Sequence, residues 1–185
     1  MTKKTRAKIP SPRERPFLWG IFLFAAFMLG WTACGGKLPE QDVVLYNRTA
    51  SLPIGFYLRI PVAASRGDLV TYDPPEDVLA FSYAHGYMEH EKAIFLKRIG
   101  AMAGDTYGVD KNGNFYVDGN YVGPVSITDS KGKPLPQIER GVLHTVPEGE
   151  FLPLGDSTQS FDGRYTGTVS LSRIQSRVVP LLAFW

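Results

Sequence analysis

The sequence predicts a mainly β protein, in which a β-rich body follows one hydrophobic helix at the N-terminus. Of its 185 residues, 19 are glycine and 14 are proline, which favours many short turns over long helices. No stretch after residue 36 has the apolar spacing of a long amphipathic helix, whereas short β-branched and aromatic runs recur between polar turns. The length suits one domain with an anchor rather than two full domains.

The hydrophobic segment extends from Phe17 to Ala33 and contains no charged residue. Its length is about the minimum for a helix that spans a hydrocarbon core of roughly 30 Å. Basic residues precede it, and positive charge at that end keeps the end in the cytoplasm, so the rest of the chain is expected outside. The basic residues are Lys3, Lys4, Arg6, Lys8, Arg13 and Arg15, against the single acid Glu14.

These features predict a basic cytoplasmic tail over residues 1–16, a transmembrane anchor over residues 17–34 and a periplasmic domain over residues 35–185. The protein is then a single-pass protein of the inner membrane. The same segment is also compatible with a cleaved signal peptide, because Ala33 and Gly35 are small enough for a cleavage site. The apolar region of a signal peptide is normally shorter, roughly 7–15 residues, so an uncleaved anchor is the preferred interpretation.

Short strands separated by breaker-rich loops make up the predicted body. Residues 47–55 are polar and rich in turn formers, so they are expected to form a loop between two strands. Residues 76–87 are compatible with a short helical turn, and residues 123–141 are expected to form a surface insertion. Strand patterns cover residues 43–46, 56–60, 69–72, 93–99, 114–117, 142–146, 151–154 and 168–185.

Charge, cysteine and histidine content exclude several classes of function. The formal net charge is only +2, so no nucleic-acid partner is expected. One cysteine, Cys34, allows no intramolecular disulfide. His85, His90 and His144 do not have the spacing of a zinc site, and no glycine-rich phosphate loop is present, so neither a metal nor a cofactor is expected.

The most apolar strand of the body carries a lysine. Side chains alternate between the two faces of a strand, so Lys97 shares one face with Phe95 and Ile99. Burial disfavours the ammonium form and lowers the pKa of a lysine, which lets the neutral amine act as a general base. The adjacent Arg98 cannot do so, because a guanidinium keeps its proton. A lysine whose stem packs while its head reaches water produces the same pattern, so this strand alone leaves both interpretations open.

A candidate nucleophile lies in the loop over residues 47–55. Ser51 is preceded by Thr49 and followed by Pro53 and Gly55, residues typical of a rigid turn that presents a hydroxyl. The Ser51 N–H and the Thr49 hydroxyl are then candidates to stabilise an oxyanion. A serine in such a loop is more often a turn former, so the hypothesis depends on a base elsewhere in the chain.

Three segments together resemble a known family. Residues 47–57, which contain the form Ser-x-Pro-x-Gly-x-Tyr, are similar to the nucleophile box of the signal peptidase I superfamily, and within it to the TraF-type conjugal-transfer peptidases. Residues 95–105 resemble the box that carries the general-base lysine, and residues 155–165 resemble the superfamily's Gly-Asp-Asn…Ser-x-Asp-Ser-Arg-Tyr box. The order of these boxes behind an N-terminal anchor agrees as well.

The resemblance implies a signal-peptidase-like, β-rich fold and a serine peptidase with a Ser/Lys dyad and no catalytic histidine. Ser51 matches the nucleophile and Lys97 the general base. Thr49 matches the position whose hydroxyl helps the Ser51 N–H to hold the oxyanion, and Ser160 matches a serine that orients the lysine. A structural network beneath the site is matched by Asp156, Asp162 and Arg164.

Departures from the superfamily pattern favour the TraF-like branch. Pro53 follows Ser51 by two residues, where typical leader peptidases have three, and this spacing favours the TraF-like branch. Met102-Ala103 replaces Leu-Pro, which argues against general leader-peptidase activity. The resemblance implies that the substrate is an exported precursor protein, with a conjugative pilin as the expected one. It leaves open whether the acyl group passes to water or to an amine, which would cyclise the product.

A second class of function fits the same sequence. A non-catalytic, membrane-tethered β scaffold of an export or conjugation apparatus would keep the fold and lose the dyad. The two hypotheses differ in whether the Ser51 hydroxyl lies within hydrogen-bond reach of the Lys97 amine.

Overall fold

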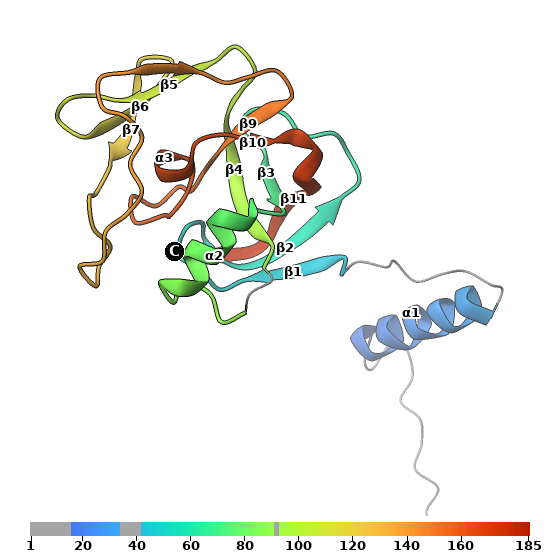
Figure 1. The fold of residues 1–185 in the computed structure, drawn as a ribbon. Helices are drawn as coiled ribbons and strands as arrows, with labels where there is room; N and C mark the ends of the chain where they lie inside the picture. Colours follow the sequence, from blue (N-terminus) through green and yellow to red (C-terminus); the bar gives the residue numbers. More distant parts are fainter. Residues whose placement is uncertain (1–15, 34–41, 91–92) are drawn as a thin grey trace, which may run out of the picture. The chain divides into compact units, whose positions relative to one another are not determined.

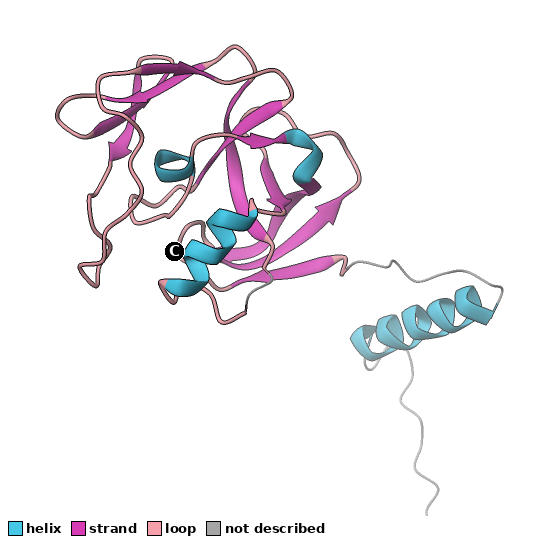
Figure 2. Cartoon of the chain, in the orientation of Figure 1, coloured by secondary structure: helices cyan, strands magenta, loops and turns pink. Residues whose placement is uncertain are grey.

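The computed structural model describes residues 16–33, 42–90 and 93–185 of the chain (Figure 1). They fall into two compact units, an N-terminal helix and a body that begins at Asp42. In its described part the body consists mainly of strands, and short helices interrupt the loops between them (Figure 2). The prediction of a mainly β protein is confirmed.

The N-terminal unit contains helix α1, Pro16–Ala33, which coincides with the predicted transmembrane segment over residues 17–34. Within the part of the chain that the structure describes, no helix is both long enough and apolar enough to cross a membrane. The basic tail of residues 1–15 and Cys34 lie outside the described residues.

Seven strands of the body form one antiparallel sheet, in the order β1-β2-β11-β3-β4-β9-β10. The C-terminal strand β11 lies between β2 and β3 and so ties the end of the chain to the strand that follows the Ser51 loop. Strand β4, which carries Lys97, lies away from both edges, between β3 and β9. The strands are β1 (Val44–Asn47), β2 (Ile54–Ile60), β3 (Leu69–Tyr72), β4 (Phe95–Met102), β9 (Glu150–Leu154), β10 (Val169–Ser170) and β11 (Ile174–Phe184).

A second antiparallel sheet has four strands, in the order β7-β6-β5-β8 (upper left in Figure 1). Asp118 and Gly119, with φ angles of 49° and 74°, form the two-residue hairpin turn between β6 and β7. The sequence predicted a surface insertion over residues 123–141, but residues 123 and 124 form the end of β7. As an edge strand, β7 accommodates Pro124, which has no N–H to pair. The strands are β5 (Thr106–Val109), β6 (Asn114–Val117), β7 (Asn120–Pro124) and β8 (Leu143–Thr145).

Short helices connect the strands of the body. Helix α2, Glu76–Ala84, lies where the sequence was compatible with a helical turn, and it leads into one wall of the candidate site. Helix α3, Gly163–Thr166, is a single turn, capped by the Asp162 side chain, which accepts from the Arg164 N–H at 3.1 Å. A 3₁₀ turn, η1 (Leu171–Arg173), leads into β11.

Two apolar clusters stabilise the body, and β4 and β9 contribute to both. Because alternate strand residues point to opposite faces, Phe151 enters one cluster while Leu152 enters the other. Ile99 and Ala101 are also divided between the clusters, because the pairing register of β4 with β9 shifts between them. The first cluster contains Val70, Tyr72, Ile99, Phe151 and Val169.

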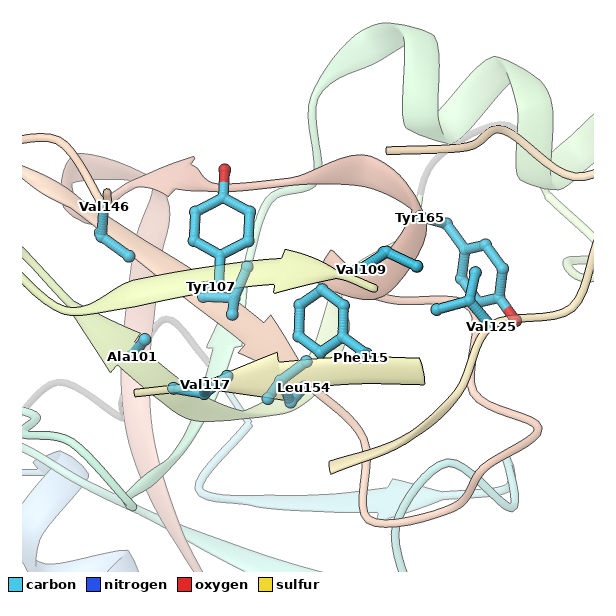
Figure 3. Close-up of a cluster of buried hydrophobic side chains, with 10 residues drawn as sticks. Ala101, Tyr107, Val109, Phe115, Val117, Val125, Val146, Leu154 and Tyr165 are labelled. Carbon is cyan, nitrogen blue, oxygen red and sulfur yellow. The ribbon is translucent and has the colours of Figure 1, made fainter. Parts of the chain in front are cut away.

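The second cluster joins the four-stranded sheet to β4 and β9 (Figure 3). Phe115 of β6 is fully buried in it, and full burial of such a side chain contributes about 1.5–3 kcal/mol to stability. Strands β4 and β9 are therefore fixed by packing on both sides, which makes β4 a rigid carrier for Lys97. The cluster contains Ala101, Tyr107, Val109, Phe115, Val117, Val125, Val146, Leu152, Leu154 and Tyr165.

Candidate active site

A cavity of about 710 Å³ brings several of the predicted site residues together. Most of its lining comes from the end of β1 and the following loop, the segment after α2, the start of β4, part of the insertion between β7 and β8, and the loop before α3. Single residues of β2, β3 and α3 complete it: Arg59, Thr71 and Tyr165. Four predicted site residues line it: Thr49, Ser51, Lys97 and Ser160. These residues lie far apart in the sequence, so the tertiary fold creates this juxtaposition.

Lys97 is buried on β4, and its side chain ends at the cavity. The residue is only 5% exposed, and its Nζ donates to the Ser160 Oγ at 2.7 Å. Burial lowers the pKa of Lys97 to about 8, with the Asp162 charge opposing the shift and the Arg164 charge adding to it. Among the described residues, Lys97 forms no ion pair with a carboxylate. A substantial fraction of its amine is therefore neutral slightly above neutral pH.

Ser51 lies in the loop between β1 and β2 and is partly exposed to the cavity. Leu52 beside it is fully buried, and the Ser51 carbonyl accepts a hydrogen bond from the Ser157 N–H at 3.2 Å. A Cβ on Gly155 would lie 2.2 Å from the Ser160 Oγ and 2.9 Å from the Ser51 carbonyl oxygen. Glycine at this position thus lets Ser160 and the Ser51 backbone approach each other.

Ser51 and Lys97 line the same cavity, but no hydrogen bond joins these two described residues directly. Lys97 binds Ser160, and Ser51 binds Ser157 of the same loop. Among the described residues, no hydrogen bond joins the Ser51 hydroxyl to the Lys97 amine, whose hydroxyl partner is Ser160. Catalytic hydrogen bonds are often long in a free enzyme and tighten when substrate binds. The structure places nucleophile and base candidates at one site without the direct contact expected of a formed dyad.

Thr49 was expected to donate its hydroxyl to an oxyanion, and the structure gives that hydroxyl a different partner. Thr49 Oγ1 donates to Asn47 Oδ1 at 2.9 Å, and the Thr49 N–H donates to the same oxygen at 3.1 Å. A hydroxyl carries a single proton, so this hydroxyl cannot also donate into the cavity in this arrangement. The Ser51 N–H is the other member of the predicted oxyanion pair.

Asp162 and Arg164 form a buried ion pair behind the site. Their side chains are 0% and 1% exposed, and Nη2 of Arg164 lies 2.7 Å from Oδ2 of Asp162. Burial alone lowers the pKa of Arg164, but hydrogen bonds and attraction from Asp162 raise it overall. Asp162 also accepts from the Gly155 N–H at 2.7 Å, and Arg164 donates to the Ser157 carbonyl at 2.6 Å. The pair therefore holds the segment that contacts Ser51.

Asp156 was predicted to join the same network, and the structure places it elsewhere. Its carboxylate accepts two hydrogen bonds from Arg98, at 2.6 and 2.8 Å, in a pair whose side chains are 29% and 39% exposed. Arg98 follows Lys97 on β4, and consecutive strand residues point to opposite faces. Asp156 is thus drawn to the face of β4 opposite the buried lysine.

Residues that the sequence did not single out complete the cavity wall. Tyr87, which follows α2, donates its hydroxyl to Asp129 of the insertion at 2.7 Å, which joins two segments of the wall. Phe161 stacks on Phe81 of α2 at 5.0 Å between ring centroids. No motif marked Phe81 in α2 or Tyr87 in the following loop as parts of the site. Phe161 lay within the recognised box over residues 155–165, and Asn47 lay within the recognised nucleophile box.

The site thus lies in a mainly β domain, where a buried, low-pKa lysine and a serine-bearing loop line one cavity. The chain belongs to the family described as signal peptidase, peptidase S26, whose family model matches residues 17–183. The predicted superfamily is confirmed.

Relatives with curated names support the TraF-like branch. Two Escherichia coli proteins, each named plasmid transfer protein TraF, are similar to the chain. One is 30% identical over 147 residues, covering 75% of this chain and 82% of the relative. The other is 29% identical over 162 residues, covering 82% of this chain and 88% of the relative. A crystal structure of a signal peptidase I from Enterococcus faecalis is 21% identical, with a TM-score of 0.39, covering 64% of this chain and 98% of that one.

Proposed function

We propose that the protein is a membrane-anchored serine endopeptidase that processes exported precursor proteins with a Ser51/Lys97 dyad. One observation carries the proposal: a buried lysine, with its pKa lowered to about 8, lines the same cavity as a serine in the loop between β1 and β2. A lysine with this pKa is available as a neutral base where an ordinary lysine is not. Membership of the signal peptidase family supports a role in processing exported proteins.

In the proposed mechanism the hydroxyl oxygen of Ser51 attacks the scissile carbonyl carbon. The neutral Nζ of Lys97 takes the hydroxyl proton, and Ser160 keeps that amine oriented through its hydrogen bond. The Ser51 N–H donates to the oxyanion of the tetrahedral intermediate. Lys97, now protonated, gives its proton to the leaving amine, and the carbonyl carbon stays bonded to Ser51 as an acyl-enzyme.

Either water or an amine can release this acyl group. Water gives a cleaved product, whereas the amino terminus of the precursor gives a cyclised one. The plasmid transfer names of the two relatives favour a conjugative pilin as the precursor. Mass spectrometry of a co-expressed candidate pilin precursor separates the two outcomes, because cyclisation leaves the product one water lighter than hydrolysis does.

The proposal includes a location at the inner membrane, with the body in the periplasm. It is supported by the uncharged segment from Phe17 to Ala33 and by the basic residues before it. Alkaline phosphatase fused to the C-terminus is expected to be active, since that enzyme requires the periplasm. Activity only from a fusion to a cytoplasmic reporter would refute both the orientation and the exported substrate.

The dyad is tested by replacing Ser51 and Lys97 with alanine, singly and together. Each single variant is expected to abolish precursor processing, and the double variant is expected to be little worse, because the two residues act as a unit. Processing by the wild type should rise with pH along a single ionisation near the Lys97 pKa of about 8. A folded Ser51→Ala protein that still cleaves the precursor would show instead that the chain is a scaffold copurifying with another peptidase.

A further inference from the structure

Asn47, at the end of β1, forms an unusually complete set of hydrogen bonds with the loop that carries Ser51. Asn47 is 7% exposed. Its Nδ2 faces the carbonyl oxygens of Thr49, Leu52 and Pro53 at 3.0, 3.1 and 3.0 Å. Its Oδ1 accepts from the N–H and the hydroxyl of Thr49 at 3.1 and 2.9 Å. All of these partners lie within the loop, on both sides of Ser51.

The chemistry of this set requires a carboxamide. The nitrogen of Asn47 faces only carbonyl acceptors and the oxygen faces only donors, so the orientation of the amide group is determined by its partners. An aspartate at this position would direct a carboxylate at three carbonyl oxygens. An alanine would remove the side-chain donor from the Thr49 carbonyl and the buried Leu52 carbonyl, and would leave the Pro53 carbonyl with the Tyr57 hydroxyl alone. The side chain thus substitutes for the backbone pairing that a loop lacks.

Tyr57 on β2 also binds this loop, at a carbonyl that Asn47 contacts as well. Its hydroxyl donates to the Pro53 carbonyl at 2.6 Å, and its side chain is fully buried. Burial, followed by the charge of Asp156, raises the pKa of Tyr57, so its hydroxyl keeps its proton and remains a donor. Between the two lies Gly55, where a Cβ would come within 2.1 Å of the Leu182 carbonyl oxygen on β11. The end of the loop is therefore tied to the sheet.

We propose that Asn47, assisted by Tyr57, is the positioning residue of the nucleophile. Its carboxamide fixes the loop on both sides of Ser51, so that the Ser51 hydroxyl enters the cavity at one defined place. It also engages the Thr49 hydroxyl inside the loop, which makes Thr49 a member of this support rather than an oxyanion donor. The inference rests on the proposed peptidase function, in which Ser51 is the attacking group.

The test compares Asn47→Ala and Tyr57→Phe with a matched control, Asp110→Ala. Asp110 also supports a loop: its carboxylate accepts from the N–H groups of Asn112 and Asn114 at 2.8 Å each and from Asn114 Nδ2 at 3.0 Å. It lies between β5 and β6, outside the cavity lining. The full-length variants are assayed with a candidate conjugative pilin precursor, and rates are expressed per folded molecule from circular dichroism.

Asn47→Ala is expected to lower kcat about 100-fold with KM changed by less than about threefold, because a displacement of about 1 Å of the nucleophile has an effect of that size. Tyr57→Phe, which keeps the ring and loses one hydrogen bond, should lower kcat about tenfold. The pH midpoint of activity should stay the same in both, since the surroundings of Lys97 are unchanged. Asp110→Ala should lower the melting temperature and leave kcat per folded molecule unchanged.

Hydrogen–deuterium exchange provides a readout that needs no substrate. Asn47→Ala should lose amide protection over residues 49–53 while β3 and β4 keep theirs. Unchanged protection of that loop, or kcat per folded molecule equal to wild type, overturns the inference. A wild-type protein that processes no precursor, or a Ser51→Ala variant that does, overturns the proposed function instead, and the exchange result still decides whether Asn47 holds the loop.

Discussion

Among its described residues, the body contains two buried cations close to each other, and their pKa values are shifted in opposite directions. Lys97 is 5% exposed and donates to the neutral Ser160 hydroxyl, whereas Arg164 is 1% exposed and forms a bidentate pair with Asp162. The pKa of Lys97 is lowered to about 8, and the pKa of Arg164 is raised. Burial opposes charge at both sites, so the difference comes from the partner.

This difference gives the two residues separate roles: Arg164 supports the fold, and Lys97 is the candidate for proton transfer. A buried guanidinium with its own carboxylate stays charged and fixes the backbone around Gly155 and Ser157. A buried amine with only a hydroxyl for a partner is easily deprotonated, at some expense of stability. Five substitutions and one matched control test this division, and the largest effect is expected for the residue that must exchange a proton.

Lys97→Arg is expected to reduce precursor processing about 10³-fold or more, because arginine keeps the charge but cannot accept the Ser51 proton. Arg98→Lys is the matched control and should process at a rate near that of the wild type, since the half-exposed Arg98 points to the opposite face of the strand from Lys97. Rates are measured by the appearance of processed precursor. A Lys97→Arg protein with a rate near that of the wild type would remove Lys97 from the mechanism.

Asp162→Ala is expected to destabilise the protein by about 3–5 kcal/mol, because Arg164 is left buried and unpaired. Arg164→Ala should have an effect of similar size for the converse reason. Urea denaturation measures both, and activity should fall with stability as the segment around Gly155 loosens. Unchanged midpoints in both variants would show that the pair does not support the fold.

Lys97→Met is expected to be inactive and more stable at pH 7 by about 2 kcal/mol. The shift of the Lys97 pKa from 10.5 to about 8 corresponds to about 3 kcal/mol, and loss of the Ser160 hydrogen bond offsets about 1 kcal/mol. The unfolded chain binds the lysine proton more tightly than the folded chain does, so the destabilisation of the wild type by Lys97 has its full size below pH 8. It declines as the pH rises towards 10.5, and the advantage of the variant should decline with it.

Urea denaturation between pH 7 and 10.5 follows this advantage. A Lys97→Met protein that is less stable than the wild type at pH 7, with the same dependence on pH, would mean that the amine is not desolvated in the fold.

Asp156→Asn is expected to change stability by less than about 1 kcal/mol, because its pair with Arg98 is substantially exposed and screened by solvent. The melting temperature should shift by only a few degrees, and processing should be unaffected. A loss of stability as large as that of Asp162→Ala would show that Asp156 belongs to the buried network of Asp162 and Arg164.

Local patterns in the sequence were sufficient for much of the fold. The strands over residues 69–72 and 114–117 have the predicted bounds, because each is a short apolar and aromatic run between clear turn signals. Residues 120–124 were missed as a strand because Gly119 before them and the pair Gly123-Pro124 at their end are usually signs of a loop. Their strand conformation depends on the hairpin with β6, which no local propensity reports.

At the candidate site, the sequence by itself determined that Lys97 faces the apolar side of its strand, because alternation of side chains is a local property of extended backbone. It also determined that Ser51 lies in a constrained turn. Only the tertiary structure decided that Lys97 meets Ser160, 63 residues away, that Asp156 pairs with Arg98 rather than joining Asp162, and that Asn47 engages the Thr49 hydroxyl. Partners of this kind depend on the register between strands and on the course of loops, and both are determined by packing over the whole domain.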